Sequence, residues 1–160
     1  MTTTKPKLAD RPRNPVPAYD EDFFAWTMGQ AAALETRRTD QIDWSNLAEE
    51  IRSLGNNEKN EIESRLLVLL QHLLKWAYQP SGRKGGWAAT IREQRRRIGK
   101  RILQSPSLKS YPAEVLADEY ADARLNAADE TGLSADAFPQ ACPFAIDDVL
   151  DPNFWPETHP

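Results

Sequence analysis

The strongest chemical signal in this 160-residue chain is a run of basic side chains between Arg83 and Arg101. Eight Lys and Arg residues stand there against one acid, Glu93. Cationic groups at this density bind phosphate oxygens, so the run predicts a site for RNA or another polyanion. Gly85, Gly86 and Trp87 would admit a nucleotide at one end and stack against it. The expected contact residues are Arg83, Lys84, Arg92, Arg96, Arg97, Lys100 and Arg101.

The acidic segment that follows offers a different interpretation of the same basic run. Residues 112–160 hold eleven Asp and Glu residues against Arg124 alone. Neighbouring antiparallel helices touch, so this segment is expected to neutralise part of the basic face. The carboxylates best placed to do so are Glu114, Asp118, Asp122 and Asp129. The formal net charge of −4 also opposes long-range attraction to nucleic acid. The sequence leaves both interpretations open.

A second pattern that could do chemistry joins Arg65 and His72. Seven residues make nearly two helical turns, which places both side chains on one flank, about 20° apart. The spacing resembles the motif of HEPN-type helical ribonucleases, although Leu66 stands where those enzymes favour a polar residue. In such an enzyme the imidazole moves the proton of a 2′-hydroxyl while the guanidinium stabilises charge on phosphate. The alternative is a histidine at the edge of the core, four residues before Trp76.

Metal and cofactor patterns do not appear in the sequence. Cys142 is the only cysteine, which excludes internal disulfides and thiolate zinc sites. Leu69 stands three residues before His72, so the Glu-x-x-His of di-iron bundles is missing. We therefore expect no metal site and no cofactor.

The elements that position these residues are predicted to be helices. Apolar residues recur at helical spacing, and no stretch alternates with a period of two. The first helix is expected from Asp20 to about Arg38. A second is expected to be capped by Asp43 and to end at Gly55. Three further helices are expected over residues 58–78, 87–104 and about 112–131, and Gly132 is expected to end the last of these. A short helical piece is expected at residues 146–150.

The helix over residues 58–78 is expected to be central, since apolar residues cover about half its circumference. The fold class is therefore all-α, with about five helices packed around one long apolar central helix. Pro-rich extensions precede and follow this body. Residues 1–18 are expected to form an extended basic arm, and residues 19–160 a single helical domain. Phe144, Phe154 and Trp155 predict that the C-terminal extension packs back onto the domain.

One charged pair is expected inside this body. Arg95 falls within the apolar stripe of its helix, and Glu119 falls within the apolar stripe of the next. A buried Arg95–Glu119 pair would fix the register of the two helices at little net gain in stability.

Several segments together resemble a bacterial family known as domain of unknown function 29. The segments are residues 19–26 (YDEDFFAW), 43–51 (DWSNLAEEI), 72–80 (HLLKWAYQP), 90–98 (TIREQRRRI), 120–124 (YADAR), 130–133 (ETGL) and 142–144 (CPF). The resemblance covers about residues 19–156. It implies a helical fold and a bacterial origin, and it implies no activity.

Taken together, these observations predict a non-enzymatic binding or interaction module. A protein partner or self-association is expected, because a strongly apolar central helix has limited cover in a short chain. The N-terminus lacks a signal-peptide core and no run of 18 apolar residues occurs, so we expect a cytoplasmic protein. Two alternatives stay open, namely RNA or polyanion binding through residues 87–104 and a metal-independent ribonuclease using Arg65 and His72.

Overall fold

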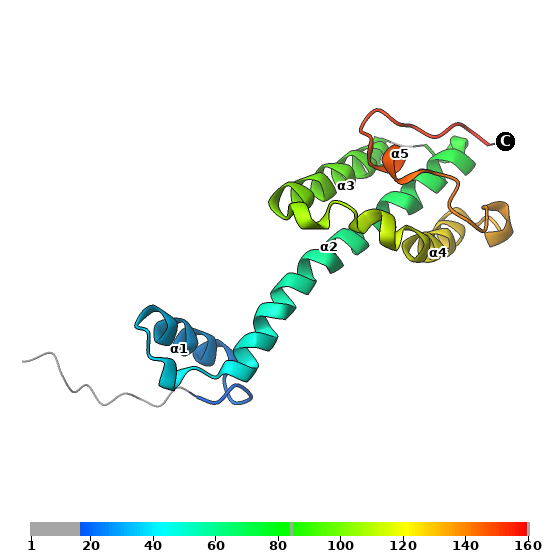
Figure 1. The fold of residues 1–160 in the computed structure, drawn as a ribbon. Helices are drawn as coiled ribbons and strands as arrows, with labels where there is room; N and C mark the ends of the chain where they lie inside the picture. Colours follow the sequence, from blue (N-terminus) through cyan, green and yellow to red (C-terminus); the bar gives the residue numbers. More distant parts are fainter. Residues whose placement is uncertain (1–16, 84, 160) are drawn as a thin grey trace, which may run out of the picture. The chain divides into compact units, whose positions relative to one another are not determined.

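The computed structural model describes residues 17–83 and 85–159, and over these residues the protein is all-α, as predicted. The predicted arm over residues 1–18 lies outside the described residues, apart from its last two. Within the described ranges there are five α-helices and no strand (Figure 1). The helices are α1 (Phe23–Glu35), α2 (Trp44–Tyr78), α3 (Gly85–Gln104), α4 (Tyr111–Thr131) and α5 (Ile146–Leu150). Short 3-10 turns occur at Thr39–Gln41, Pro80–Gly82, Pro106–Leu108 and Ala135–Ala137.

The long helix α2 replaces two predicted helices. Gly55 was expected to end the first of them, but α2 runs unbroken through this position for 35 residues. A glycine inside a helix costs only about 1 kcal/mol relative to alanine. Asn56 and Asn57, which follow Gly55, are also weak helix formers, but no proline interrupts the segment, so the helix continues through this position at a modest cost.

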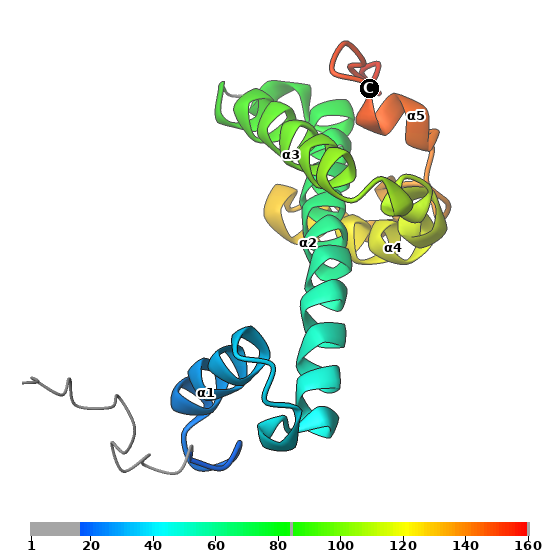
Figure 2. The same cartoon turned by 60° about the vertical axis from the view of Figure 1, so that its left-hand side comes forward.

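The contacts divide the chain into two compact units, Met1–Ser53 and Leu54–Pro160, with the boundary inside α2. In the first unit, α1 lies beside the first turns of α2 (Figure 2). Asp22, not the predicted Asp20, caps α1 by accepting a hydrogen bond from the backbone N–H of Ala25 (2.9 Å). Asp43 caps α2 as predicted, through the N–H of Asn46 (3.3 Å).

Two polar contacts tie the parts of the first unit together. The side-chain carbonyl of Gln30 in α1 accepts a hydrogen bond from the backbone N–H of Asp43 (2.8 Å). The hydroxyl of Tyr19, in the turn before α1, donates to Glu50 of α2 (2.5 Å). The Tyr19 ring also packs edge-on against Trp26, which is almost fully buried.

In the second unit, the C-terminal half of α2 forms the predicted buried core. Figures 1 and 2 show α3, α4 and α5 gathered around it. Seven of its apolar residues have no exposed surface: Ile62, Leu66, Leu69, Leu70, Leu73, Leu74 and Ala77. The five leucines belong to one cluster that also contains Ile91, Tyr120 and Val149 from the other helices. The chain itself therefore supplies the cover that we expected from a second copy.

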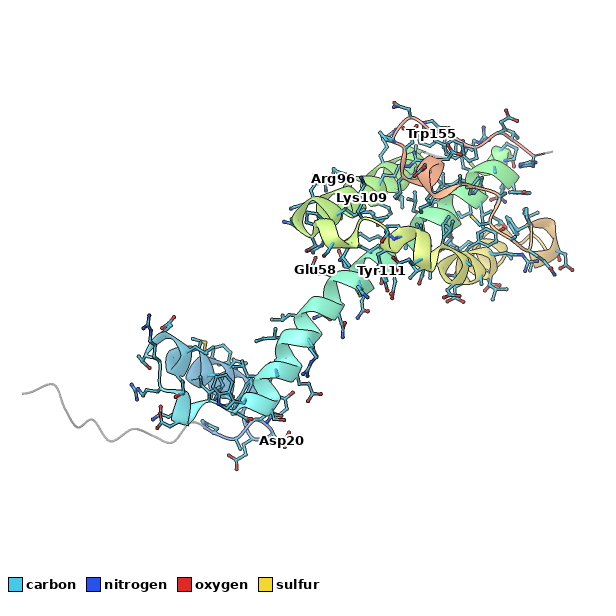
Figure 3. The ribbon with its side chains drawn as sticks, viewed as in Figure 1. Asp20, Glu58, Arg96, Lys109, Tyr111 and Trp155 are labelled. Atoms are coloured by element: carbon cyan, nitrogen blue, oxygen red, sulfur yellow. The ribbon has the colours of Figure 1, made fainter. Side chains whose placement is uncertain are left out.

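The C-terminal extension packs onto this unit, as predicted. Trp155, labelled in Figure 3, lies against Trp76 with 4.7 Å between ring centroids. His159 stacks on Tyr78, and its backbone N–H donates to the carbonyl of Ala77 (2.9 Å). No helix within residues 17–83 and 85–159 is both long enough and apolar enough to span a membrane.

Candidate anion-binding site

The basic run folds into α3, and one flank of this helix lines a hollow of about 230 Å³ beside α2. We call this site the basic hollow. Its lining residues are Glu61 of α2 and Arg96, Arg97, Lys100, Arg101 and Gln104 of α3. The α3 residues are two adjacent pairs four residues apart and one residue a further turn along, so the helical period places them on one flank. Four cations thus face one carboxylate among the described side chains that line it.

Two of these arginines are held by an acid on their own helix. Glu93 accepts hydrogen bonds from Arg96 (3.0 Å) and from the Nε of Arg97 (2.5 Å). The bond from Arg96 and then that from Arg97 lower the pKa of Glu93 to about 2, so the carboxylate stays ionised. All three side chains are exposed to solvent by a third or more, so these pairs add little stability. They order the guanidinium groups at the rim without removing them from solvent.

The other wall of the hollow belongs to α2. Nη1 of Arg101 contacts both oxygens of Glu58 (3.2 and 3.3 Å; Figure 3 labels Glu58), and its Nη2 lies 3.9 Å from Glu61. Glu61 is engaged more closely by Arg65, one turn further along α2 (2.5 Å). Arg65 also donates to Gln94 of α3 (3.1 Å). These contacts hold α3 against α2 at the hollow.

Lys100 and Arg92 are exposed cations of α3 that the surrounding acids leave uncompensated. Within the described part of the chain, neither makes a hydrogen bond or ion pair to a carboxylate. Lys100 also lines the basic hollow. An anion entering the hollow would therefore meet at least one ammonium group that has no competing partner.

Part of the basic face is neutralised within the chain, but not by the acidic segment that was expected to do so. Among the described residues, Glu114, Asp118, Asp122 and Asp129 form no ion pair with α3. Glu114 instead accepts a hydrogen bond from Ser110 (2.8 Å), at the start of its own helix. Carboxylates of α2 take the place of those expected from α4, because α2 is the helix that borders this flank of α3.

Among the described residues, Arg83 and Arg92 of the predicted contact set and the predicted stacking residue Trp87 do not line the hollow. Arg83 donates through Nε to the carbonyl of Trp76 (2.9 Å), and its guanidinium lies over the Trp76 ring. Lys84 lies outside the described residues. Trp87, predicted to stack a base, is half-buried with the Lys75 ammonium 4.6 Å from its ring centroid. Arg83 and Trp87 therefore serve the packing of the second unit.

The structure does not bring Arg65 and His72 to a shared site. Arg65 is engaged by Glu61 and Gln94, while Nδ1 of His72 lies 2.8 Å from the carbonyl of Val68 on its own helix. Neither side chain lines the basic hollow. Burial lowers the pKa of His72, which favours the neutral ring. The ribonuclease hypothesis stays a prediction without support from this geometry.

Arg95 is buried as expected, but the predicted pair with Glu119 does not form. Its Nε donates to the carbonyl of Val149 in α5 (2.8 Å), and its guanidinium lies 5.8 Å from the Trp155 ring centroid. Nη1 and Nη2 have no hydrogen-bond partner within the described chain. Glu119 faces other acids, so burial first and then Glu63 raise its pKa. Arg95 points toward α5 because that short helix, and not α4, covers its side of α3.

No group of three or more His, Cys, Asp and Glu residues is placed to hold a metal ion in the ranges that the structure describes. The thiol of Cys142 is half-buried and donates to the carbonyl of Phe144 (3.4 Å). Burial raises the pKa of this thiol, which favours the protonated form over the reactive thiolate.

Sequence reasoning missed the α2 side of the basic hollow. Glu58 and Glu61 are separated from Arg101 by up to 43 residues, and their contacts depend on the offset between two helices. Helical periodicity carries no information on that offset. The signal that could have found them is the pair of acids at i and i+3 on α2, at the end that an antiparallel α3 must approach.

The comparisons with known proteins assign the chain to a family. The family model described as "Domain of unknown function DUF29" matches residues 18–155, so the chain belongs to this family. No curated protein and no solved structure matches the chain. The family carries no assigned activity, so a function must be inferred from the geometry above.

Proposed function

We propose that this protein is a non-enzymatic binding module whose basic hollow binds the phosphate backbone of nucleic acid. The observation that supports this proposal most directly is the lining of the hollow, where Arg96, Arg97, Lys100 and Arg101 face Glu61 alone among the described lining residues. Phosphate oxygens suit such a lining because guanidinium groups bind them through paired N–H donors.

The chemistry of the lining favours a backbone over bases. All six lining residues are charged or polar, and none of them is aromatic. Single-stranded nucleic acid is bound largely by stacking of its bases on aromatic side chains, and Trp87 is already covered by Lys75. A duplex presents its phosphates outward and needs no such platform. We therefore expect a duplex to bind at least as tightly as a single strand of the same length.

The acids beside the hollow limit affinity without closing the site. Glu93 and Glu58 compete for three of the four arginine and lysine groups, so binding must displace or share these contacts. Because exposed ion pairs contribute at most about 1 kcal/mol each, a polyphosphate can replace them at small cost. Binding should accordingly be weak at physiological salt and clear at low salt.

The test compares two double variants that change the net charge equally. Arg97→Gln with Lys100→Gln removes cations of the basic hollow, and Arg52→Gln with Lys109→Gln removes two exposed cations elsewhere. Binding of labelled duplex RNA, duplex DNA and single-stranded RNA is measured by fluorescence anisotropy over a range of salt concentrations. A plot of log affinity against log salt has a negative slope. The first variant should make this slope shallower by about 2, and the control should leave it unchanged.

Each arm of this experiment bears on the proposal. Equal loss in both double variants would show non-specific attraction to charge, and no binding of any duplex at low salt would overturn the proposal. A strong preference for single strands would contradict the argument from the missing aromatic platform. A preference between the two duplexes identifies which nucleic acid supplies the phosphates.

A further inference from the structure

The end of the chain covers two aromatic rings at the end of α2. We call residues 154–159 the strap, and Figure 3 labels Trp155 within it. The Trp155 ring lies against Trp76 with 4.7 Å between the ring centroids. The His159 ring stacks on Tyr78 at the same centroid distance, with an angle of 16° between the ring planes. Each of the two rings of α2 is therefore paired with a ring of the strap.

A guanidinium group joins these two ring pairs. The Arg83 guanidinium lies 4.8 Å from the Trp76 ring centroid, and its Nη2 donates a hydrogen bond to the hydroxyl of Thr158 (2.7 Å). Residues 155–159 can span at most about 14 Å when fully extended. Because this short segment contacts all three groups in turn, Trp76, Tyr78 and Arg83 lie along one short track. We call these three residues the covered platform.

The covered platform has the chemistry of a site for single-stranded nucleic acid. Such sites stack bases on aromatic rings and hold the backbone with cations. In the strap, the planar rings of Trp155 and His159 take the places of two bases, and the Thr158 hydroxyl oxygen takes the place of a phosphate oxygen. The contact specific to a peptide is the hydrogen bond from the His159 N–H to the carbonyl of Ala77 (2.9 Å). The ring and guanidinium contacts suit any ligand that carries rings and anionic oxygens.

A second guanidinium beside the strap is left without partners. Trp155 lies over Arg95, with 5.8 Å from the guanidinium carbon to the ring centroid. Arg95 is only 5% exposed, and its Nη1 and Nη2 make no hydrogen bond within the described part of the chain. A buried donor without an acceptor lowers the stability of the arrangement that buries it. The closed strap therefore leaves two donors that a phosphate could satisfy.

The outer half of the strap is held more weakly than its inner half. Pro156 is buried, whereas Glu157, Thr158 and His159 are exposed. Segments with few buried contacts and exposed hydrogen bonds open locally at a small fraction of the free energy of global unfolding. The strap can therefore release Tyr78 while the helices stay folded.

From these contacts we propose that the covered platform is a second nucleic-acid site, specific for single strands, which the strap closes by binding to it. The inference rests on the proposed function for the class of ligand, but not on the basic hollow, whose lining includes no residue of the platform. A single strand and the strap compete for the same groups, so each excludes the other. With the strap in place, the chain binds single strands weakly.

The first experiment opens the outer half of the strap in the full chain. Thr158→Ala with His159→Pro removes the hydrogen bond to Arg83, the ring stacked on Tyr78 and the N–H that bonds to Ala77. Pro152→Ala with Asn153→Ala, at two exposed positions of the same extension, is the matched control.

Binding of labelled single-stranded RNA and single-stranded DNA is measured by fluorescence anisotropy at low salt. One base stacked on an aromatic ring changes affinity by about 5- to 140-fold, so the strap variant should bind single strands at least about fivefold more tightly than the wild type. The control should match the wild type. A preference between the two strands identifies which nucleic acid fits the platform.

The duplex measurements separate this inference from the proposed function. The strap variant should bind duplexes as the wild type does, and adding Arg97→Gln with Lys100→Gln should leave its gain for single strands intact. Loss of duplex binding with that gain retained would overturn the proposed function alone. Unchanged affinity for single strands in a strap variant whose circular dichroism is that of the wild type overturns the covered platform alone. An equal gain for duplexes and single strands also overturns it.

A second measurement locates the bound strand directly. A single strand is cross-linked to the strap variant by ultraviolet light, and the cross-linked peptides are identified by mass spectrometry. Cross-links should fall on Trp76 or Tyr78, and they should be stronger in the strap variant than in the wild type. Cross-links confined to residues 92–104 would place the strand on α3 and overturn the platform.

Discussion

The continuity of α2 can be tested by replacing one glycine with alanine. Gly55 lies eleven residues into α2, and a Cβ atom added there would meet no other atom within 4 Å. Its φ is not positive, since Gly132 is the glycine with positive φ among the described residues. Alanine in a helix interior is better than glycine by about 0.5–1 kcal/mol. Gly55→Ala should therefore raise the free energy of unfolding by that amount.

Two other glycines serve as matched controls for this substitution. Gly99 lies inside α3 with equally open space, so Gly99→Ala should stabilise the protein to a similar extent. Gly132 ends α4 at φ 72°, in the left-handed region, and its N–H donates to the carbonyl of Ala128 (2.9 Å). An alanine Cβ at this position would meet no other atom, but the left-handed conformation would cost alanine about 1–2 kcal/mol. Gly132→Ala should therefore destabilise the protein.

The assay is urea unfolding followed by circular dichroism, with thermal unfolding as a second measurement. For a chain of this length, 1 kcal/mol corresponds to a shift in Tm of about 2–4 °C. The decisive comparison is between Gly55→Ala and Gly132→Ala. If Gly55→Ala destabilises the protein as Gly132→Ala does, then α2 is broken by a left-handed residue at position 55 and the argument for one continuous helix fails.

Two further predictions concern His72 and Arg95, two ionisable side chains removed in part or almost wholly from solvent. Burial lowers the pKa of folded His72, so the unfolded chain takes up a proton that the folded chain resists once the pH falls below about 6.5. The free energy of unfolding of the wild type should fall between about pH 7.5 and pH 5.5, and it should fall less in His72→Gln. Urea titrations at the two pH values measure both changes, and an equal fall in wild type and variant would contradict this. Arg95→Ala should cost about 2–4 kcal/mol through lost packing against Trp155, whereas Arg95→Met, which fills the space and removes two unpaired nitrogens, should cost less than about 1 kcal/mol. Calorimetry of both variants checks the order, and an equal loss would show that the charge of Arg95 matters more than its volume.

Much of the fold could be predicted from local patterns. The segment of α2 from Ile62 to Ala77 is buried where its apolar period predicts, since the 3.6-residue repeat itself determines which side chains share a face. Gly132 was identified as a helix stop because it follows the last periodic residue and can adopt positive φ. Gly55 has the same local pattern and does not end its helix. The local pattern does not distinguish a tolerated glycine from a terminal one, because the difference is about 1 kcal/mol and contacts elsewhere decide it.

The candidate site was predicted only on one side. The recurrence of arginine and lysine along α3 is sufficient to place Arg96, Arg97 and Lys100 on one flank. The sequence predicted that acids of α4 would meet the cations of this flank, and this was wrong because acids of α2 meet Arg101 there. Proximity along the chain favoured α4, but the packing of α3 against the buried stripe of α2 brings Glu58 and Glu61 beside Arg101.

The amino-acid sequence by itself determined the helical class, the buried stripe of α2 and the cationic flank of α3. These follow from interactions within a few residues, which repeat with the helical period and need no knowledge of the rest of the chain. Only the tertiary structure decided which acids meet the arginines, that Arg95 points to Val149 and not to Glu119, and that Phe24 and Met28 of α1 stay exposed. Each of these depends on how one helix is offset and rotated against another, and that is determined by the packing of whole side-chain surfaces.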